Sequence, residues 1–168
     1  MSEPYRVCVV CTGNICRSPM GEFILRELFE EAGLGDRVVV DSAGTTSWEV
    51  GNPADPRTLA VLERNGHADF GGREHVARAF EHGWLAERDL VLAADRGHAS
   101  TLRSYARTPE DAAKVRLFRS FDPAADEDAE MPDPWYGDAA AFDQTYAEVT
   151  AAARGVVDFV RDDLDRRG

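Results

Sequence analysis

The chain has 168 residues, of which 43% are hydrophobic and 30% charged, a balance typical of a soluble globular protein rather than a disordered one. Its 31 acidic and 19 basic side chains give a formal net charge of −12, which disfavours binding to nucleic acid or to an anionic membrane surface. No apolar run approaches the roughly 20 residues that span a bilayer, and the start, MSEPYR, lacks the pattern of a secretory signal. We therefore expect one cytoplasmic domain over residues 1–168, with export by a route that uses no signal peptide as an open alternative.

The first half of the chain alternates between strand and helix patterns. An apolar, β-branched run predicts a buried strand over residues 5–11. Ser18 and the proline after it predict the N-cap and first turn of a helix that Gly33 ends. A second strand is expected over 37–43, and a second helix follows a turn-rich loop and covers 57–65.

The second half continues this alternation. A buried strand over 89–94 leads into a helix that Asp95 begins as N-cap and that runs to residue 105. A short strand over 115–118 is followed by an acidic loop and a long amphipathic helix over 139–165. Strands that alternate with helices indicate a parallel sheet covered on both faces. The predicted fold is therefore a three-layer α/β domain with a four-stranded parallel sheet and helices on both faces.

All three cysteines, Cys8, Cys11 and Cys16, lie in one short segment, and none follows. This spacing is not a disulfide framework, and no further His or Cys cluster supplies the ligands of a metal site. Cys8 falls inside the first strand, where a core position is expected. Cys11 ends that strand, so we interpret it as a reactive thiol.

The sequence CTGNICRS, residues 11–18, joins the first strand to the first helix and is called the thiol loop below. Ligands of open parallel sheets bind at the carboxyl ends of the strands, where loop N–H groups and a helix N-terminus form an anion site. Gly13 allows the tight turn, and Arg17 can hold two oxygens of a tetrahedral anion. The same positive field favours the thiolate form of Cys11. A simple turn beside a buried cysteine would not account for Asn14, Arg17 and Ser18 together, so the loop predicts a nucleophile towards phosphorus.

CTGNICRS and DPWYGD, residues 133–138, resemble the low-molecular-weight protein tyrosine phosphatases, and the actinobacterial members in particular. The likeness covers almost the whole chain, with further matches in SAGT, GNPADPR, HVAR and LFRSFDP, which begin at residues 42, 51, 75 and 117. The resemblance implies the fold predicted above, hydrolysis of aryl phosphates and of phosphotyrosine in protein substrates, and no metal or other cofactor.

Residue roles follow from the resemblance. Cys11 matches the nucleophile that forms a phosphocysteine, Arg17 the side chain that binds the phosphoryl group, and Asp133 the general acid and base. The rest of the phosphate-binding loop falls on Thr12, Gly13, Asn14, Ile15, Cys16 and Ser18. His75 matches a histidine that supports Asn14. An acid is needed because a phenolate leaves far more easily when it is protonated, although an Asp-Pro pair alone is more often a surface turn.

Three aromatic residues, Trp48, Trp135 and Tyr136, resemble the family's substrate rim, where flat rings favour an aromatic phosphate over an aliphatic one; packing aromatics are the alternative. Cys16 matches a second cysteine that can trap oxidised Cys11 as a reversible disulfide. The remaining histidines match no motif and are expected at the surface or at helix ends, at positions 67, 82 and 98.

Three rival functions use a similar loop. Arsenate reductases of this fold need further cysteines downstream, and none follows Cys16. Protein arginine phosphatases tend to carry threonine where Ile15 stands, and an apolar side chain there better suits an aryl phosphate. A phosphotyrosine-binding module without activity would be expected to have lost Cys11, Arg17 or Asp133, and all three are present.

Overall fold

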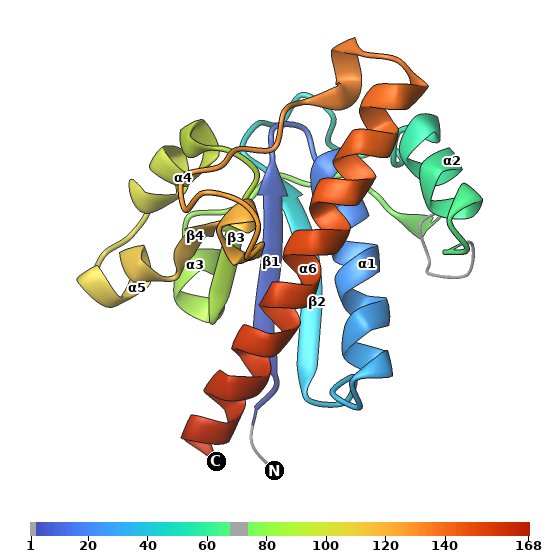
Figure 1. Ribbon diagram of the computed structural model, residues 1–168. Helices are drawn as coiled ribbons and strands as arrows, with labels where there is room; N and C mark the ends of the chain where they lie inside the picture. Colours follow the sequence, from blue (N-terminus) through green and yellow to red (C-terminus); the bar gives the residue numbers. More distant parts are fainter. Residues whose placement is uncertain (1–2, 68–73) are drawn as a thin grey trace.

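A computed structural model describes residues 3–67 and 74–168. Its centre is a sheet with the strand order β2-β1-β3-β4. The strands are β1 (Tyr5–Cys11), β2 (Val38–Gly44), β3 (Leu90–Ala93) and β4 (Val115–Leu117). All neighbouring strands run parallel, as Figure 1 shows for β1 and β2. The predicted four-stranded parallel sheet is confirmed, and each strand ends within one or two residues of its expected range.

Helices cover both faces of the sheet because alternate residues of each buried strand point to opposite sides. Val7 and Val9 of β1 pack into an apolar cluster with α1 (Arg17–Glu31), α2 (Pro56–Arg64) and α6 (Ala139–Arg167). Cys8 and Val10 face a second cluster that includes residues of α3 (Trp84–Glu87) and α4 (Arg96–Arg103). Cys8 is fully buried there, as its place in the strand predicted. Figure 1 shows α1 and α6 side by side across one face of β1 and β2.

Helix caps are formed by local side-chain bonds in two of the helices near the sheet's carboxyl edge. Asp55 Oδ1 accepts from the N–H of Arg57 at the start of α2, and Asp95 Oδ1 accepts from the N–H of His98 at the start of α4. The Asp95 cap was predicted. The Ser18 cap is wrong: α1 begins at Arg17, its N-cap position makes no side-chain bond, and the Ser18 hydroxyl is used elsewhere.

Several short helical segments escaped prediction because three to five residues carry no periodic apolar pattern. They are α3, α5 (Pro109–Ala113) and two 3₁₀ turns, η2 (Phe118–Phe121) and η3 (Pro134–Tyr136). The last of these lies in the predicted acidic loop, which passes over the carboxyl end of β1 in Figure 1. No helix within the described ranges has the length and apolar character to cross a membrane.

Candidate active site

A cavity of about 160 Å³ opens beyond the carboxyl end of β1. Three segments that are far apart in the sequence line it, from the thiol loop, from the loop after β2 and from the segment around Asp133. The lining residues are Cys11, Thr12, Gly13, Ile15, Cys16, Arg17, Trp48, Glu49, Asp133, Trp135 and Tyr136. The structure therefore brings together every candidate residue except Asn14 and Ser18, which are buried within the thiol loop, and His75, which contacts the Asn14 carbonyl oxygen.

The thiol of Cys11 is buried, with 3% of the residue exposed, and its Sγ lies 3.0 Å from Ser18 Oγ. Ser18 Oγ also accepts a hydrogen bond of 2.8 Å from Asn14 Nδ2. Because that bond occupies an acceptor position of the hydroxyl, its own proton can point at the sulfur. The Ser18 hydroxyl thus links the Cys11 sulfur to the Asn14 side chain.

Asn14 determines the shape of the thiol loop. Its backbone has φ +62°, in the left-handed region, and the residue is fully buried. Nδ2 donates to Ser42 Oγ at 2.9 Å, and Ser42 in turn donates to Glu22 Oε1. Oδ1 accepts from the N–H of Arg78 at 3.0 Å, while His75 Nε2 lies 2.7 Å from the Asn14 carbonyl oxygen. Hydrogen bonds to both polar atoms of the side chain and to the backbone carbonyl oxygen therefore stabilise the strained conformation of Asn14.

The backbone of the thiol loop leaves its donors available. The carbonyl oxygens of Cys11 and Thr12 accept from the N–H groups of Thr45 and Thr46, at 2.9 and 3.1 Å. By contrast, none of the N–H groups of residues 12–18 donates a hydrogen bond to any residue that the structure describes. Such free donors at the start of a 15-residue helix are what an anion site requires. The loop can therefore hold a tetrahedral anion.

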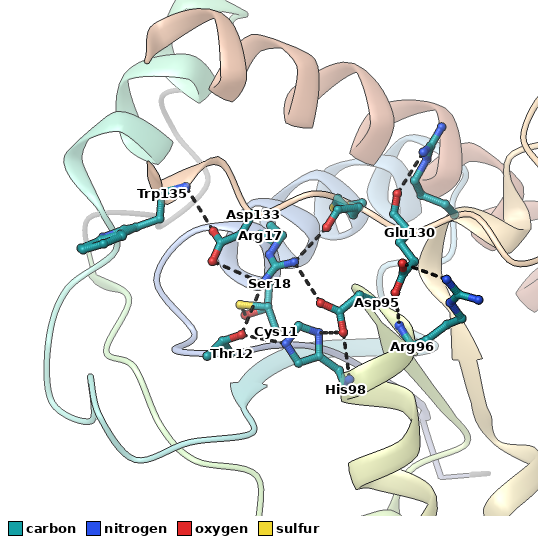
Figure 2. A network of polar contacts seen from close by, with 12 residues as sticks. Cys11, Thr12, Arg17, Ser18, Asp95, Arg96, His98, Glu130, Asp133 and Trp135 are labelled. Carbon is teal, nitrogen blue, oxygen red and sulfur yellow. Dashed lines mark hydrogen bonds and ion pairs between the residues drawn. The ribbon is translucent and has the colours of Figure 1, made fainter. Parts of the chain in front are cut away.

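The Arg17 guanidinium is almost fully buried and oriented from several sides (Figure 2). One terminal nitrogen, Nη1, donates to the Met131 carbonyl oxygen at 2.8 Å and lies 3.5 Å from Asp95 Oδ2. The other, Nη2, lies 3.4 Å from Thr12 Oγ1 and 3.6 Å from Asp133 Oδ2. Its charge is therefore shared between two carboxylates at the edge of the cavity.

Asp133 begins the segment 133–138, called the acid loop below. Its Oδ1 accepts from the N–H of Trp135 at 3.1 Å, and about a third of the side chain is exposed. Arg57 of α2 supports this loop: Nη1 donates to the carbonyl oxygens of Trp135 and Gly137, at 3.1 and 3.3 Å. The same guanidinium binds both carboxylate oxygens of Asp55. Arg57 was not identified as a site residue from the sequence.

The aromatic residues stand at the mouth of the cavity. Trp48 is 78% exposed and Tyr136 84%, so neither is a packing aromatic, whereas Trp135 is 46% exposed and partly buried. The rings of Trp135 and Tyr136 meet edge to face, with centroids 4.9 Å apart. Together with Trp48 they supply the aromatic part of the cavity lining.

His98 lies at a helix end, in the first turn of α4, which is one of the two places that the sequence analysis expected, but it is not at the surface, because only 6% of it is exposed. Its Nε2 lies 2.8 Å from Thr12 Oγ1, and its Nδ1 lies 3.1 Å from Asp95 Oδ1 (Figure 2). Burial lowers the pKa of His98 despite the nearby carboxylate of Asp95. Of the other two, His82 is exposed and stacks on a tyrosine, whereas His67 is only partly exposed and contacts Glu27 and Tyr146.

Cys16 is buried beside the cavity and forms no disulfide. Burial, and next the negative charge of Asp55, raise its pKa, so this thiol stays protonated at neutral pH. No group of three or more His, Cys, Asp or Glu residues in the described ranges could hold a metal ion. Cys11, Arg17 and Asp133 all line the same cavity.

Comparisons with known proteins agree with this geometry. A family described as low molecular weight phosphotyrosine protein phosphatase matches residues 6–166. A low molecular weight protein-tyrosine-phosphatase of Streptomyces coelicolor is 51% identical over 97% of this chain and 98% of its own. A low molecular weight protein-tyrosine phosphatase A of Mycobacterium tuberculosis is 42% identical over 100% and 99%. Among solved structures, Vibrio vulnificus Wzb in complex with benzylphosphonate has a TM-score of 0.77 at 29% identity and covers 92% of this chain and 97% of its own.

Proposed function

The chain belongs to the low-molecular-weight phosphotyrosine protein phosphatase family, with relatives in two actinobacteria as its motifs predicted, and is a protein-tyrosine phosphatase. From this premise we propose that it hydrolyses phosphotyrosine and aryl phosphates through a phosphocysteine on Cys11. Arg17 binds the phosphoryl group, and Asp133 serves as general acid and then base. The observation that carries the proposal is the meeting of these three side chains around one cavity whose floor is the thiol loop.

In the first step the Cys11 sulfur attacks phosphorus, so that an S–P bond forms while the ester P–O bond breaks. Asp133 gives its proton to the departing phenolate oxygen. The charge on the equatorial oxygens is met by the N–H groups of the thiol loop and by Arg17. In the second step Asp133 takes a proton from water, whose oxygen attacks phosphorus. Inorganic phosphate leaves and the thiolate of Cys11 is restored.

Substrate choice follows from the rim. A phosphotyrosine ring can lie between the exposed faces of Trp48, Trp135 and Tyr136, whereas a phosphoserine stem is too short to reach them. Ile15 adds an apolar wall to the cavity, which suits an aryl group better than a phosphorylated guanidinium. Benzylphosphonate, bound by the related Wzb, combines the same ring and anion and is a suitable probe of this site.

Rates on two aryl phosphates with different leaving groups test the assignments. Asp133→Ala should slow a poor leaving group by about 10²- to 10³-fold and a good one much less, because only the poor one needs the proton. Glu127→Ala, an exposed carboxylate of the same acidic segment, is the matched control and should change neither rate. Equal losses on both substrates would remove Asp133 from the acid role.

Cys11→Ser should abolish turnover yet keep affinity for benzylphosphonate, since the loop N–H groups and Arg17 remain. Turnover of phenyl phosphate by this variant would contradict the phosphocysteine. Parallel assays of the unchanged protein on phosphoarginine and phosphotyrosine peptides decide between the two substrate classes. Faster hydrolysis of phosphoarginine would overturn phosphotyrosine as the proposed substrate.

We also propose that Cys16 protects the oxidised nucleophile. Peroxide would convert the Cys11 thiolate to a sulfenic acid, and the Cys16 thiol would then displace water to form a disulfide that added thiol reduces. The protonated state of Cys16 supports this order, because the ionised sulfur is the one that oxidises first. In Cys16→Ser, peroxide-treated protein should no longer recover with thiol, and unchanged recovery would contradict the proposal.

A further inference from the structure

Thr12, Arg17, Asp95 and His98 form a closed ring of polar contacts at the edge of the cavity (Figure 2). Arg17 Nη2 lies 3.4 Å from Thr12 Oγ1, and Thr12 Oγ1 lies 2.8 Å from His98 Nε2. His98 Nδ1 lies 3.1 Å from Asp95 Oδ1, and Asp95 Oδ2 lies 3.5 Å from Arg17 Nη1. The ring joins the thiol loop to the start of α4, 86 residues away.

The chemistry of the groups fixes the direction of one of these contacts. A guanidinium only donates, so the Thr12 oxygen accepts from Arg17. The hydroxyl keeps a proton and a second lone pair, so it can bond to His98 Nε2 in either tautomer of the imidazole. Burial lowers the pKa of His98 and so favours the neutral imidazole. Asp95, which also caps α4, lies close to His98 Nδ1, although Nδ1 forms no hydrogen bond with any residue that the structure describes.

We propose that His98 is a positioning residue of the phosphatase, which acts through the Thr12 hydroxyl to set the plane of the Arg17 guanidinium. The proposal rests on the proposed function for the role of Arg17. If Thr12 were free to rotate, its proton could turn towards Arg17 and the Nη2 contact would be lost. His98 prevents this rotation because its Nε2 holds the Thr12 hydroxyl in place through a hydrogen bond. Met131 and Asp95 restrain only Nη1, so Thr12 controls the remaining nitrogen together with Asp133.

A double-mutant cycle between Thr12 and His98 tests the proposal. His98→Leu removes the hydrogen-bond partner of Thr12, Thr12→Val removes the hydroxyl at nearly constant shape, and His98→Gln keeps an amide that can bond to the hydroxyl at a similar reach. The readouts are kcat and KM for phenyl phosphate, affinity for benzylphosphonate by calorimetry, and the melting temperature. His82→Leu is the matched control, since His82 is exposed and lies outside the site.

We expect His98→Leu and Thr12→Val each to lower kcat by about tenfold and to weaken benzylphosphonate binding by a similar factor. A tenfold change is about what the loss of one hydrogen bond causes. The double variant should lose no more than either single one, because both changes break the same contact. His98→Gln should recover most of kcat, and His82→Leu should match the unchanged protein.

The proposal is overturned if His98→Leu lowers only the melting temperature, or if the losses of the two single variants multiply in the double one. Should His98→Leu not fold, Thr12→Val against Thr12→Ser measures the same hydroxyl, and equal kcat for these two would also overturn it. Failure of the unchanged protein to hydrolyse phenyl phosphate would instead refute the proposed function, while benzylphosphonate affinity would still decide the role of His98.

Discussion

The thiol loop and the acid loop face each other across the cavity but are held in different ways. Asn14 of the thiol loop is fully buried, and its amide bonds to three neighbours through both its nitrogen and its oxygen. Asp133 of the acid loop is partly exposed, and its loop is attached to α2 by two bonds from Arg57, whose side chain is 40% exposed.

This difference corresponds to what each loop has to do. A buried network with every partner satisfied has one low-energy arrangement, because any rearrangement leaves polar groups unpaired. Contacts at the surface can be exchanged for water at little cost, which permits local opening. The thiol loop, which binds the anion, is therefore the more rigid of the two. Asp133, which must contact both substrate and water, lies on the acid loop, which is more easily displaced.

The largest effect is expected from Asn14→Ala. The change removes the hydrogen bonds of the Asn14 side chain and leaves an alanine in the left-handed conformation, φ +62°, without the bonds that hold it there. We expect kcat to fall by about 10²-fold, since displacement of the loop by an ångström misplaces thiol and donors. The free energy of unfolding should fall by about 3 kcal/mol. Steady-state kinetics and denaturant unfolding measure both.

Asn14→Gly is the informative control, because glycine adopts this conformation without strain. It should regain part of the lost stability and little of the lost activity. Full activity in Asn14→Gly would mean that backbone conformation alone, and not the buried network, holds the thiol loop.

A smaller but still large effect is expected from Gly44→Ala, which acts on the thiol loop from behind. In the sheet register Gly44 pairs with Cys11, and a Cβ at Gly44 would lie 2.6 Å from the Thr12 carbonyl oxygen. The backbone must move, so we expect a stability loss of about 1–3 kcal/mol and a fall in kcat of about tenfold or more. Gly83→Ala, where the Cβ meets open space, should change neither. An unchanged kcat in Gly44→Ala would show that the loop is less rigid than its contacts indicate.

Arg57→Ala tests the acid loop alone. Loss of its two bonds to the loop should reduce kcat by about tenfold for a poor leaving group and little for a good one, because the anion site stays intact. In the Asp133→Ala background the change should have no further effect. Arg64→Ala is the control on the same helix, since Arg64 pairs with Asp143 away from the site. Equal losses on both substrates would place Arg57 in phosphate binding instead.

Sequence patterns predicted the parts of this site that depend on neighbouring residues. The apolar, β-branched run of β1, the position of Cys11 at its end and the Asp95 cap are all local features. His98 and Arg57 were missed because their partners are 86 and 78 residues away, and no spacing in the sequence reveals such contacts. Ser18 was misassigned for a different reason. A serine before a proline is a good N-cap, but the Ser18 hydroxyl contacts Cys11 and Asn14 instead of capping the helix.

The smallest predicted effect concerns pH and the Asp55–Arg57 pair that anchors the acid loop to α2. Burial raises the pKa of Asp55, but the hydrogen bonds and the charge of Arg57 outweigh it, so the pKa lies below its ordinary value. A carboxyl with a lowered folded pKa stabilises the fold above its unfolded pKa of about 4, and this contribution disappears as the pH falls through the folded pKa. Because Arg57 is partly exposed, the contribution should be about 1 kcal/mol or less.

Comparison of the unchanged protein with Asp55→Asn checks this sign. The difference in unfolding free energy should be constant near neutral pH and should shrink below pH of about 4, where the carboxyl becomes protonated in both states. Over the same range the acid loop should detach before the thiol loop, because the bonds of the Asn14 side chain itself join only neutral amide, hydroxyl and backbone groups. Hydrogen exchange at residues 133–138 and at 12–16 would show this order, and simultaneous opening of both loops would mean that Arg57 and Asp55 do not hold the acid loop separately.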